Sequence, residues 1–156
     1  MRVDLNGMVA LVTGGAQGIG RAIAQQLSDN GAHIGIVDVD QDGADKAAKD
    51  LDGGAWYADV SDVLAMERVV SEAEERWGRL DILINNAGIN SGGDRVPIHE
   101  FSPENWDRIV DVDLRGVFVA SRAAIPAICA PTKADIIGAA TIAPKPVSPA
   151  TLVIAK

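Results

Sequence analysis

An alternation of short apolar runs with longer segments of helical periodicity constrains the fold more than any other feature of this chain. The apolar runs lie at residues 8–12, 34–37 and 55–58, and a fourth strand is expected at 80–84, where Asp81 interrupts the apolar residues. Amphipathic patterns follow the first three runs, over about 18–30, 44–51 and 62–77, with Ser61 as the expected cap of the third. Wholly apolar runs of this length are typical of strands buried on both faces of a parallel sheet. The order predicts a doubly wound α/β fold, with a helix crossing one face of the sheet between successive strands.

A further, longer helix is expected after the polar loop at 89–100. Ser102 provides a cap residue and Pro103 suits the first helical turn. The apolar residues of this segment become denser toward Pro126 and cover more than one face. A second apolar face predicts contact with another subunit, so we expect a homo-oligomer formed through the helix at 103–128.

The composition changes after residue 128. The last 28 residues hold four prolines and one acidic residue, Asp135, whereas the first 128 hold three prolines. We therefore interpret 1–128 as one folded domain and 129–156 as a divergent or truncated tail, with a helical turn at 134–140 and a strand at 151–154 as its possible structure. The sheet would then be incomplete on its C-terminal side, leaving the edge after the fourth strand or the apolar face of the long helix uncovered.

Charge and composition restrict the possible partners. The net charge of −8 argues against binding nucleic acid through its phosphates, and no apolar run approaches the length of a membrane span. The N-terminal residues lack the basic and apolar regions of a signal peptide, and Cys129 is the single cysteine. These features predict a cytoplasmic protein with a small-molecule ligand and without a metal site.

The junction between the first strand and the first helix predicts what this ligand is. It reads Thr13-Gly14-Gly15-Ala16-Gln17-Gly18-Ile19-Gly20. Glycines allow a tight turn and close approach of the backbone to a ligand, and the N-terminus of a helix attracts negative charge. Such a junction is typical of a site for the pyrophosphate of a dinucleotide, as in Rossmann folds.

Three motifs in order resemble the short-chain dehydrogenase/reductase family, over about residues 4–125. They are the T-G-x-x-x-G-x-G pattern at 13–20, Asp59-Val60, and Asn85-Asn86-Ala87-Gly88. The resemblance is greatest to 3-oxoacyl-carrier-protein reductases and to secondary alcohol or polyol dehydrogenases. It implies that Gly14, Gln17, Gly18, Ile19 and Gly20 bind the pyrophosphate side of a nicotinamide cofactor. It further implies that Asp59 and Val60 hold the adenine and that Asn86, Ala87 and Gly88 line the ribose side.

Asp38 ends the second strand, 18 residues after Gly20, close to the position of the Rossmann acid that accepts hydrogen bonds from the adenosine ribose. A carboxylate at this position repels a 2′-phosphate. Gln17 is neutral at a position where relatives that prefer NADP often carry a basic residue. We therefore expect NAD as the cofactor rather than NADP.

The catalytic motifs of the family are only partly present. Its members use a tyrosine four residues before a lysine, a serine earlier in the chain and an asparagine on the long helix. The best match to the tyrosine and lysine is Cys129 and Lys133, Asp113 stands at the asparagine position, and no serine can be assigned. The single tyrosine, Tyr57, lies on the third apolar run and is expected in the core or at the cofactor's edge.

Two functions follow from this pattern. One is an NAD-dependent oxidoreductase that transfers hydride between the nicotinamide and a secondary alcohol or ketone, with Asp113, Cys129 and Lys133 as candidate catalytic residues. The alternative is an inactive NAD-binding or dimerisation protein, encoded by a truncated or frame-shifted gene of the family.

Overall fold

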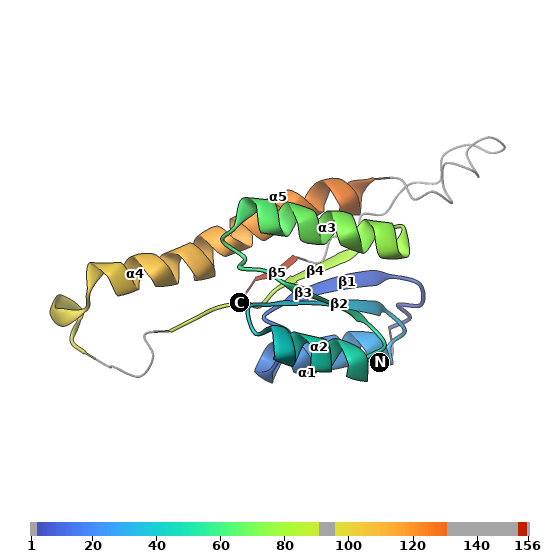
Figure 1. Cartoon of the computed structure of the whole chain (residues 1–156), viewed down its shortest axis with the longest axis horizontal. Helices are drawn as coiled ribbons and strands as arrows, with labels where there is room; N and C mark the ends of the chain where they lie inside the picture. The colour runs from blue at the N-terminus through green and yellow to red at the C-terminus, as the bar shows by residue number, and fades with distance from the viewer. Residues whose placement is uncertain (1–2, 91–95, 131–152, 156) are drawn as a thin grey trace.

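The computed structural model describes residues 3–90, 96–130 and 153–155. Within these residues a parallel sheet has the strand order β3-β2-β1-β4-β5 (Figure 1). The strands are β1 (Val9–Thr13), β2 (His33–Asp38), β3 (Gly54–Tyr57), β4 (Ile82–Asn85) and β5 (Val153–Ala155). The prediction of a doubly wound parallel sheet is therefore confirmed.

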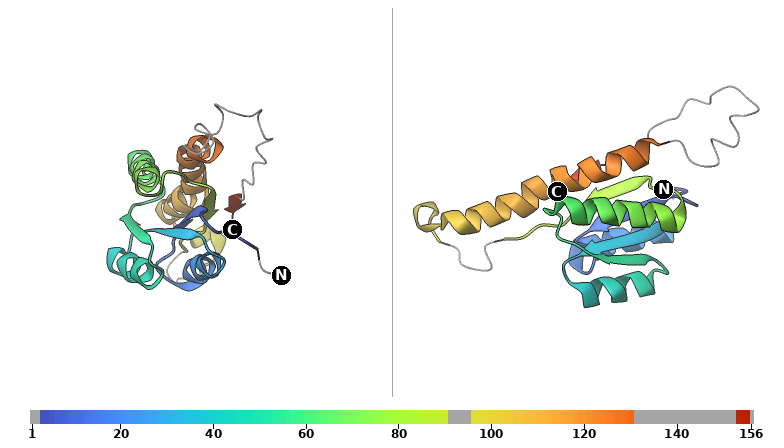
Figure 2. Two further views of the ribbon diagram at one scale, coloured as in Figure 1. Left: turned by 90° about the vertical axis from the view of Figure 1, so that its right-hand side faces the viewer. Right: turned by 45° about the horizontal axis from the view of Figure 1, so that its top comes forward.

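Helices cover both faces of this sheet. The described helices are α1 (Gly18–Asp29), α2 (Gln41–Asp50), α3 (Val63–Trp77), the 3-10 helix η1 (Ile98–Glu100), α4 (Pro103–Val110), the π-helical segment η2 (Asp111–Arg115) and α5 (Gly116–Cys129). Helices α1 and α2 lie on one face, whereas α3 and α5 lie side by side on the other (Figure 2). Helix α4 continues past the ends of the strands (Figures 1 and 2).

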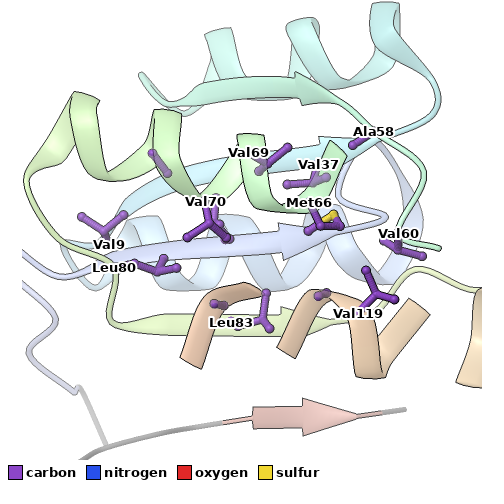
Figure 3. Close-up of a cluster of buried hydrophobic side chains, with 14 residues drawn as sticks. Val9, Val37, Ala58, Val60, Met66, Val69, Val70, Leu80, Leu83 and Val119 are labelled. Carbon is purple, nitrogen blue, oxygen red and sulfur yellow. The ribbon is translucent and has the colours of Figure 1, made fainter. Parts of the chain in front are cut away.

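The core consists of two apolar clusters, one on each face of the sheet. Val9 and Leu11 of β1 belong to the cluster under α3 and α5, and Ala10 and Val12 belong to the cluster under α1 and α2. Met66 of α3 is fully buried in the first cluster, which Figure 3 shows. Because alternate residues of one strand enter different clusters, the strand has to be apolar throughout, which is why its sequence shows a continuous run.

The sequence predicted that either the edge after the fourth strand or the apolar face of the long helix would be uncovered. The first alternative is wrong, because the outer edge of β4 is paired. Residues 83–85 pair in parallel with 153–155. The strand expected at 151–154 is thus described as Val153–Ala155, and the helical turn expected at 134–140 lies outside the described residues. A free edge strand offers unpaired backbone groups, and β5 satisfies those of β4.

The expected cap of α3 is wrong by one residue. Asp62, not Ser61, caps the helix, and its Oδ1 accepts from the backbone N–H groups of Leu64 and Ala65 at 2.9 and 3.1 Å. Ser61 instead donates its hydroxyl to Asp59 Oδ1 at 2.8 Å. Ser102 caps α4 as predicted, since its Oγ accepts from Asn105 N.

The long helical segment is interrupted by η2 and is apolar on two sides. Val119, Ala120 and Ala124 are buried against the sheet. Four large apolar side chains of the same segment are exposed: Trp106, Leu114, Phe118 and Ile125. The prediction that its apolar residues cover more than one face is confirmed.

Candidate functional site

A pocket of about 720 Å³ lies where β1, β2, β3 and β4 end. Every residue predicted to contact the cofactor lines it: Gly14, Gln17, Gly18, Ile19, Gly20, Asp38, Asp59, Val60, Asn86, Ala87 and Gly88. These residues come from four separate strand ends, and the carboxyl ends of parallel strands are where open α/β sheets bind ligands. The volume is within the range of small-molecule sites.

The N-terminus of α1 opens into this pocket without a side-chain cap. Gln17 makes no capping hydrogen bond, and the first turn contains no acidic residue. Gly18 has φ +58°, and a Cβ there would meet no atom within 4 Å. The first N–H groups of a helix have no partner within the helix and concentrate its positive dipole end. The residues present therefore fit the pyrophosphate of a dinucleotide.

Ile19 lies on the pocket side of α1. It is 60% exposed, whereas Gly20 and Ala24 provide the buried side of the helix. The first turn of α1 therefore borders the pocket.

The glycines bring the loop after β1 against the loop after β4. A Cβ on Gly14 would lie 2.8 Å from Ala87 Cα, and a Cβ on Gly20 would overlap the carbonyl oxygen of Gly14. Asn86 holds the two loops together, since its Nδ2 donates to the carbonyl oxygens of Thr13 and Gly14, both at 3.0 Å. Asn86 thus shapes the pocket through the backbone of the first loop.

Thr13 is the second link between these loops. Its Oγ1 accepts from the backbone N–H groups of Asn86 and Ala87 at 3.0 and 3.1 Å and donates to Ile84 O at 3.2 Å. The side chain is buried. This hydroxyl therefore replaces water for three backbone groups at the point where β1 and β4 end.

Asp38 is oriented by the backbone on both sides. Ala16 N donates to Asp38 Oδ2 at 3.0 Å, and Asp40 N donates to Oδ1 at 3.1 Å. Each carboxylate oxygen can accept a further hydrogen bond. Asp38 is partly buried and lines the pocket, so its carboxylate can receive two adjacent hydroxyl groups of a ligand.

Asp59, Val60, Arg108 and Val112 form the far wall of the pocket. Asp59 Oδ1 accepts from both Ser61 N and Ser61 Oγ. Val60 packs on Gly116, where a Cβ would lie 2.5 Å from Val60 Cγ2. Sequence reasoning missed Arg108 and Val112. The two residues are four apart in the sequence, so they lie on the same face of a helix, and this is the only signal that the sequence offered.

A second pocket, of about 330 Å³, adjoins the first. The two share Ala87, Gly88 and Ile89, and the second is also lined by Asn85, Asn90, Asp113 and Val117. Asp113 Oδ1 accepts from Ile89 N at 2.8 Å, and both of its oxygens face the position of a Cβ on Gly88 at 3.3 and 3.5 Å. The carboxylate therefore holds the loop after β4 against η2.

Asp111, two residues earlier, has a different environment. Arg115 donates to Asp111 Oδ1 at 2.8 Å, and this hydrogen bond is the main reason that the pKa of Asp111 is below its ordinary value. The same contact raises the pKa of Arg115. Among the described residues no salt bridge reaches Asp113.

The structure does not bring the three candidate catalytic residues together. Asp113 lines the second pocket. Cys129 is exposed at the end of α5, 13 residues and roughly 20 Å along the helix from Gly116. Lys133 lies outside the described residues. Tyr57 is 59% exposed, so the first of its two expected places, the core, is wrong. It pairs in the sheet with Asp38, a residue of the pocket, but does not line the pocket itself.

The described ranges contain neither a candidate metal cluster nor a candidate membrane span. No cluster of three or more His, Cys, Asp or Glu side chains in residues 3–90, 96–130 and 153–155 could hold a metal ion. No helix in these ranges is both long and apolar enough to cross a membrane.

Parallel strands, helices on both faces and a pocket at the strand ends define a Rossmann-type fold, and comparison with known proteins narrows the family. The family model described as short chain dehydrogenase matches residues 8–151. The chain therefore belongs to the short-chain dehydrogenase family. This match continues past residue 128, into the segment expected to be divergent.

Individual relatives agree with this assignment. Meso-2,3-butanediol dehydrogenase of Serratia marcescens is 37% identical over 145 residues, which are 91% of this chain and 55% of that protein. Levodione reductase of Leifsonia aquatica is 42% identical over 118 residues, covering 71% and 43%. The crystal structure of a 3-ketoacyl-(acyl-carrier-protein) reductase from Brucella melitensis complexed with NADH has a TM-score of 0.75 at 38% identity, covering 80% and 51%. The chain spans about half the length of the relatives it matches.

Proposed function

We propose that this chain binds NAD in the first pocket, as part of an oxidoreductase that transfers hydride between a nicotinamide and a secondary alcohol or ketone. The observation that carries the proposal is the convergence of all the predicted cofactor residues around the uncapped N-terminus of α1. A similar protein of known structure was solved with NADH, and several relatives are named as dehydrogenases of diols or polyols.

The geometry suggests where each part of the dinucleotide lies. The pyrophosphate takes the first turn of α1, between Gly14 and Gly20. Asp38 accepts hydrogen bonds from the adenosine ribose, and the adenine lies against Val60 with Asp59 at its edge. The nicotinamide half then extends along Ala87 and Gly88 into the second pocket, which these residues share with the first.

The cofactor supplies the hydride chemistry, and the protein positions the substrate and moves one proton. In alcohol oxidation a bound NAD⁺ would take the hydride from the carbon that bears the hydroxyl, and the hydroxyl proton would pass to a base of the protein. Among the residues that line the second pocket, Asp113 is the ionisable one. Lys133, which lies outside the described residues, remains a candidate for catalysis, whereas Cys129 lies roughly 20 Å along α5 from Gly116 and lines neither pocket. Replacing Lys133 by alanine should lower turnover.

Calorimetric titration of the chain with NAD tests the binding, and a panel of secondary alcohols with NAD, followed by NADH absorbance, tests the reaction. We expect saturable binding and NADH production with a diol or polyol. A folded sample without saturable binding would refute the proposal. Binding without NADH production would instead support a nucleotide-binding protein without turnover.

The preference for NAD over NADP is tested by Asp38→Asn. The wild type should bind NAD more tightly than NADP, because the Asp38 carboxylate would repel a 2′-phosphate. Asp38→Asn should lower the NADP/NAD ratio of dissociation constants by about tenfold, since one close charge pair is worth roughly 1 kcal/mol or more. Asp40→Asn is the matched control, because Asp40 is exposed, caps α2 and does not line the pocket. Tighter binding of NADP by the wild type would remove the role of Asp38.

We also propose that two copies associate through the exposed apolar side chains of α4, η2 and α5. One helical segment carries four exposed apolar side chains, those of Trp106, Leu114, Phe118 and Ile125. Two copies related by a twofold axis can bring this same surface of each copy into contact. The sequence predicts a cytoplasmic enzyme with a small-molecule substrate, and a homo-oligomer of this kind is compatible with that prediction.

A further inference from the structure

The second pocket contains a carboxylate, that of Asp113, which forms no salt bridge within the described residues. Its Oδ1 accepts from Ile89 N at 2.8 Å, which fixes the side chain over Gly88. Asp113 is exposed, and this one hydrogen bond holds its carboxylate at the wall of the cavity.

The position of this charge along a bound dinucleotide follows from the two pockets. In the order of the strands, the pocket-lining Asp59 and Asp38 follow β3 and β2, the N-terminus of α1 follows β1, and Ala87 and Gly88 follow β4. The anion-binding N-terminus of α1 therefore lies between the other two groups. An elongated ligand with its pyrophosphate in the middle must place its second nucleoside beyond α1. The second pocket is the cavity that continues there, through Ala87, Gly88 and Ile89.

The two redox forms of the cofactor differ in charge at this end only. The nicotinamide ring carries one positive charge in NAD⁺ and none in NADH, whereas the adenosine and the pyrophosphate are the same in both. A carboxylate near the ring therefore stabilises the oxidised form, and the contribution of every other part of the ligand cancels when the two affinities are compared.

We propose that Asp113 determines redox specificity, making the site bind NAD⁺ in preference to NADH. The proposal rests on the proposed binding of NAD in the first pocket. An asparagine at this position would still accept from Ile89 N but would carry no charge. The carboxylate thus adds a charge to a hydrogen bond that an amide can also make, and it makes the site load with NAD⁺ more readily than with NADH.

The test compares dissociation constants for NAD⁺ and NADH, measured by calorimetry on the full chain and on Asp113→Asn. The wild type should bind NAD⁺ more tightly. In Asp113→Asn the NADH/NAD⁺ ratio of dissociation constants should fall by about threefold or more, since removal of one partly solvated charge changes mainly the oxidised form. An unchanged ratio in a folded Asp113→Asn variant would overturn the proposal.

Two controls separate charge from structure. Asp107→Asn removes a negative charge from α4, outside the lining of both pockets, and should leave the ratio unchanged. Asp113→Ala removes the hydrogen bond to Ile89 as well as the charge, and it should weaken both forms in addition to lowering the ratio. If the NADH/NAD⁺ ratio of dissociation constants fell as much in Asp107→Asn as in Asp113→Asn, the preference for NAD⁺ would come from the net charge of −8 instead.

The wild type provides a measurement that no folding defect can affect. Raising the salt from about 0.05 to 0.5 M shortens the screening length severalfold, so the preference for NAD⁺ should decrease with salt. A preference that does not change with salt contradicts an electrostatic origin. If neither NAD⁺ nor NADH binds the folded wild type, the proposed function fails; if both bind equally, only the role of Asp113 fails.

Discussion

Gly20 and Gly18 line the same pocket, but only one of them is fixed by close packing. A Cβ on Gly20 would overlap the carbonyl oxygen of Gly14 and lie 2.5 Å from Asn86 Nδ2, whereas a Cβ on Gly18 meets nothing within 4 Å. Gly20→Ala should therefore lower the free energy of unfolding by about 2–3 kcal/mol through overpacking. Gly18→Ala should cost only about 1 kcal/mol, the strain of a left-handed backbone at φ +58°.

Urea unfolding followed by circular dichroism measures both variants. Equal losses would mean that the contacts of position 20 with Gly14 and Asn86 relax at little cost. A Gly20→Ala variant as stable as the wild type would show that the two loops can separate without cost.

Residues inside a recognisable motif could be placed from the sequence, and residues outside one could not. These pocket-lining residues were predictable because the glycine spacing and Asp38 have a physical reason to stand at a strand end, and because the family resemblance pointed to Asn86. Arg108 and Val112 were missed because a helix that borders a pocket looks like any other amphipathic helix in sequence. The hydrogen bond from Ile89 N to Asp113 joins positions 24 apart, and no local pattern indicates it.

Thr13 makes the junction of β1 and β4 depend on one hydroxyl group. Thr13→Val keeps the shape of the side chain but leaves two backbone N–H groups, those of Asn86 and Ala87, without their acceptor in a buried site. Its expected cost is about 1–3 kcal/mol. Thr13→Ser is the matched control, because it keeps the hydroxyl and removes only a methyl group.

The measurement for these two variants is again the free energy of unfolding, together with the affinity for NAD. Thr13→Val should lose more stability than Thr13→Ser and should also weaken NAD, since Ala87 lines both pockets. A larger loss in Thr13→Ser would mean that methyl packing, and not the hydroxyl, links the strands.

Strands were easier to predict than helix boundaries. Burial on both faces makes the strands wholly apolar, so β1, β2 and β4 are visible in the sequence. The start of α3 was misplaced because Ser61 and Asp62 are both good caps, and the choice depends on Asp59, whose carboxylate takes the hydroxyl of Ser61. The π-helical turn at η2 has no sequence signature, although it places Asp113 at the second pocket.

The whole molecule separates its two proposed tasks onto different surfaces. Both pockets open at the strand ends, while the exposed apolar side chains continue along α5 on the side away from the sheet. The buried side of α5 packs on the sheet through Val119, Ala120 and Ala124. A change on the outer side of α5 can therefore alter association without altering the core.

Phe118→Glu is the change that tests association. Phe118 is 65% exposed in the middle of the apolar surface, so glutamate there costs little in the monomer but would bury a charge between two copies. Wild-type protein should sediment as a dimer or larger species and Phe118→Glu as a monomer.

Val3→Glu is the control, because Val3 is similarly exposed at 59% but lies in the segment before β1. A reductant is needed in every run, since the exposed Cys129 could join two chains by a disulfide and imitate the apolar contact. Sedimentation of the wild type as a monomer at all concentrations would refute association through this helix, and loss of the dimer in Val3→Glu would place the contact elsewhere.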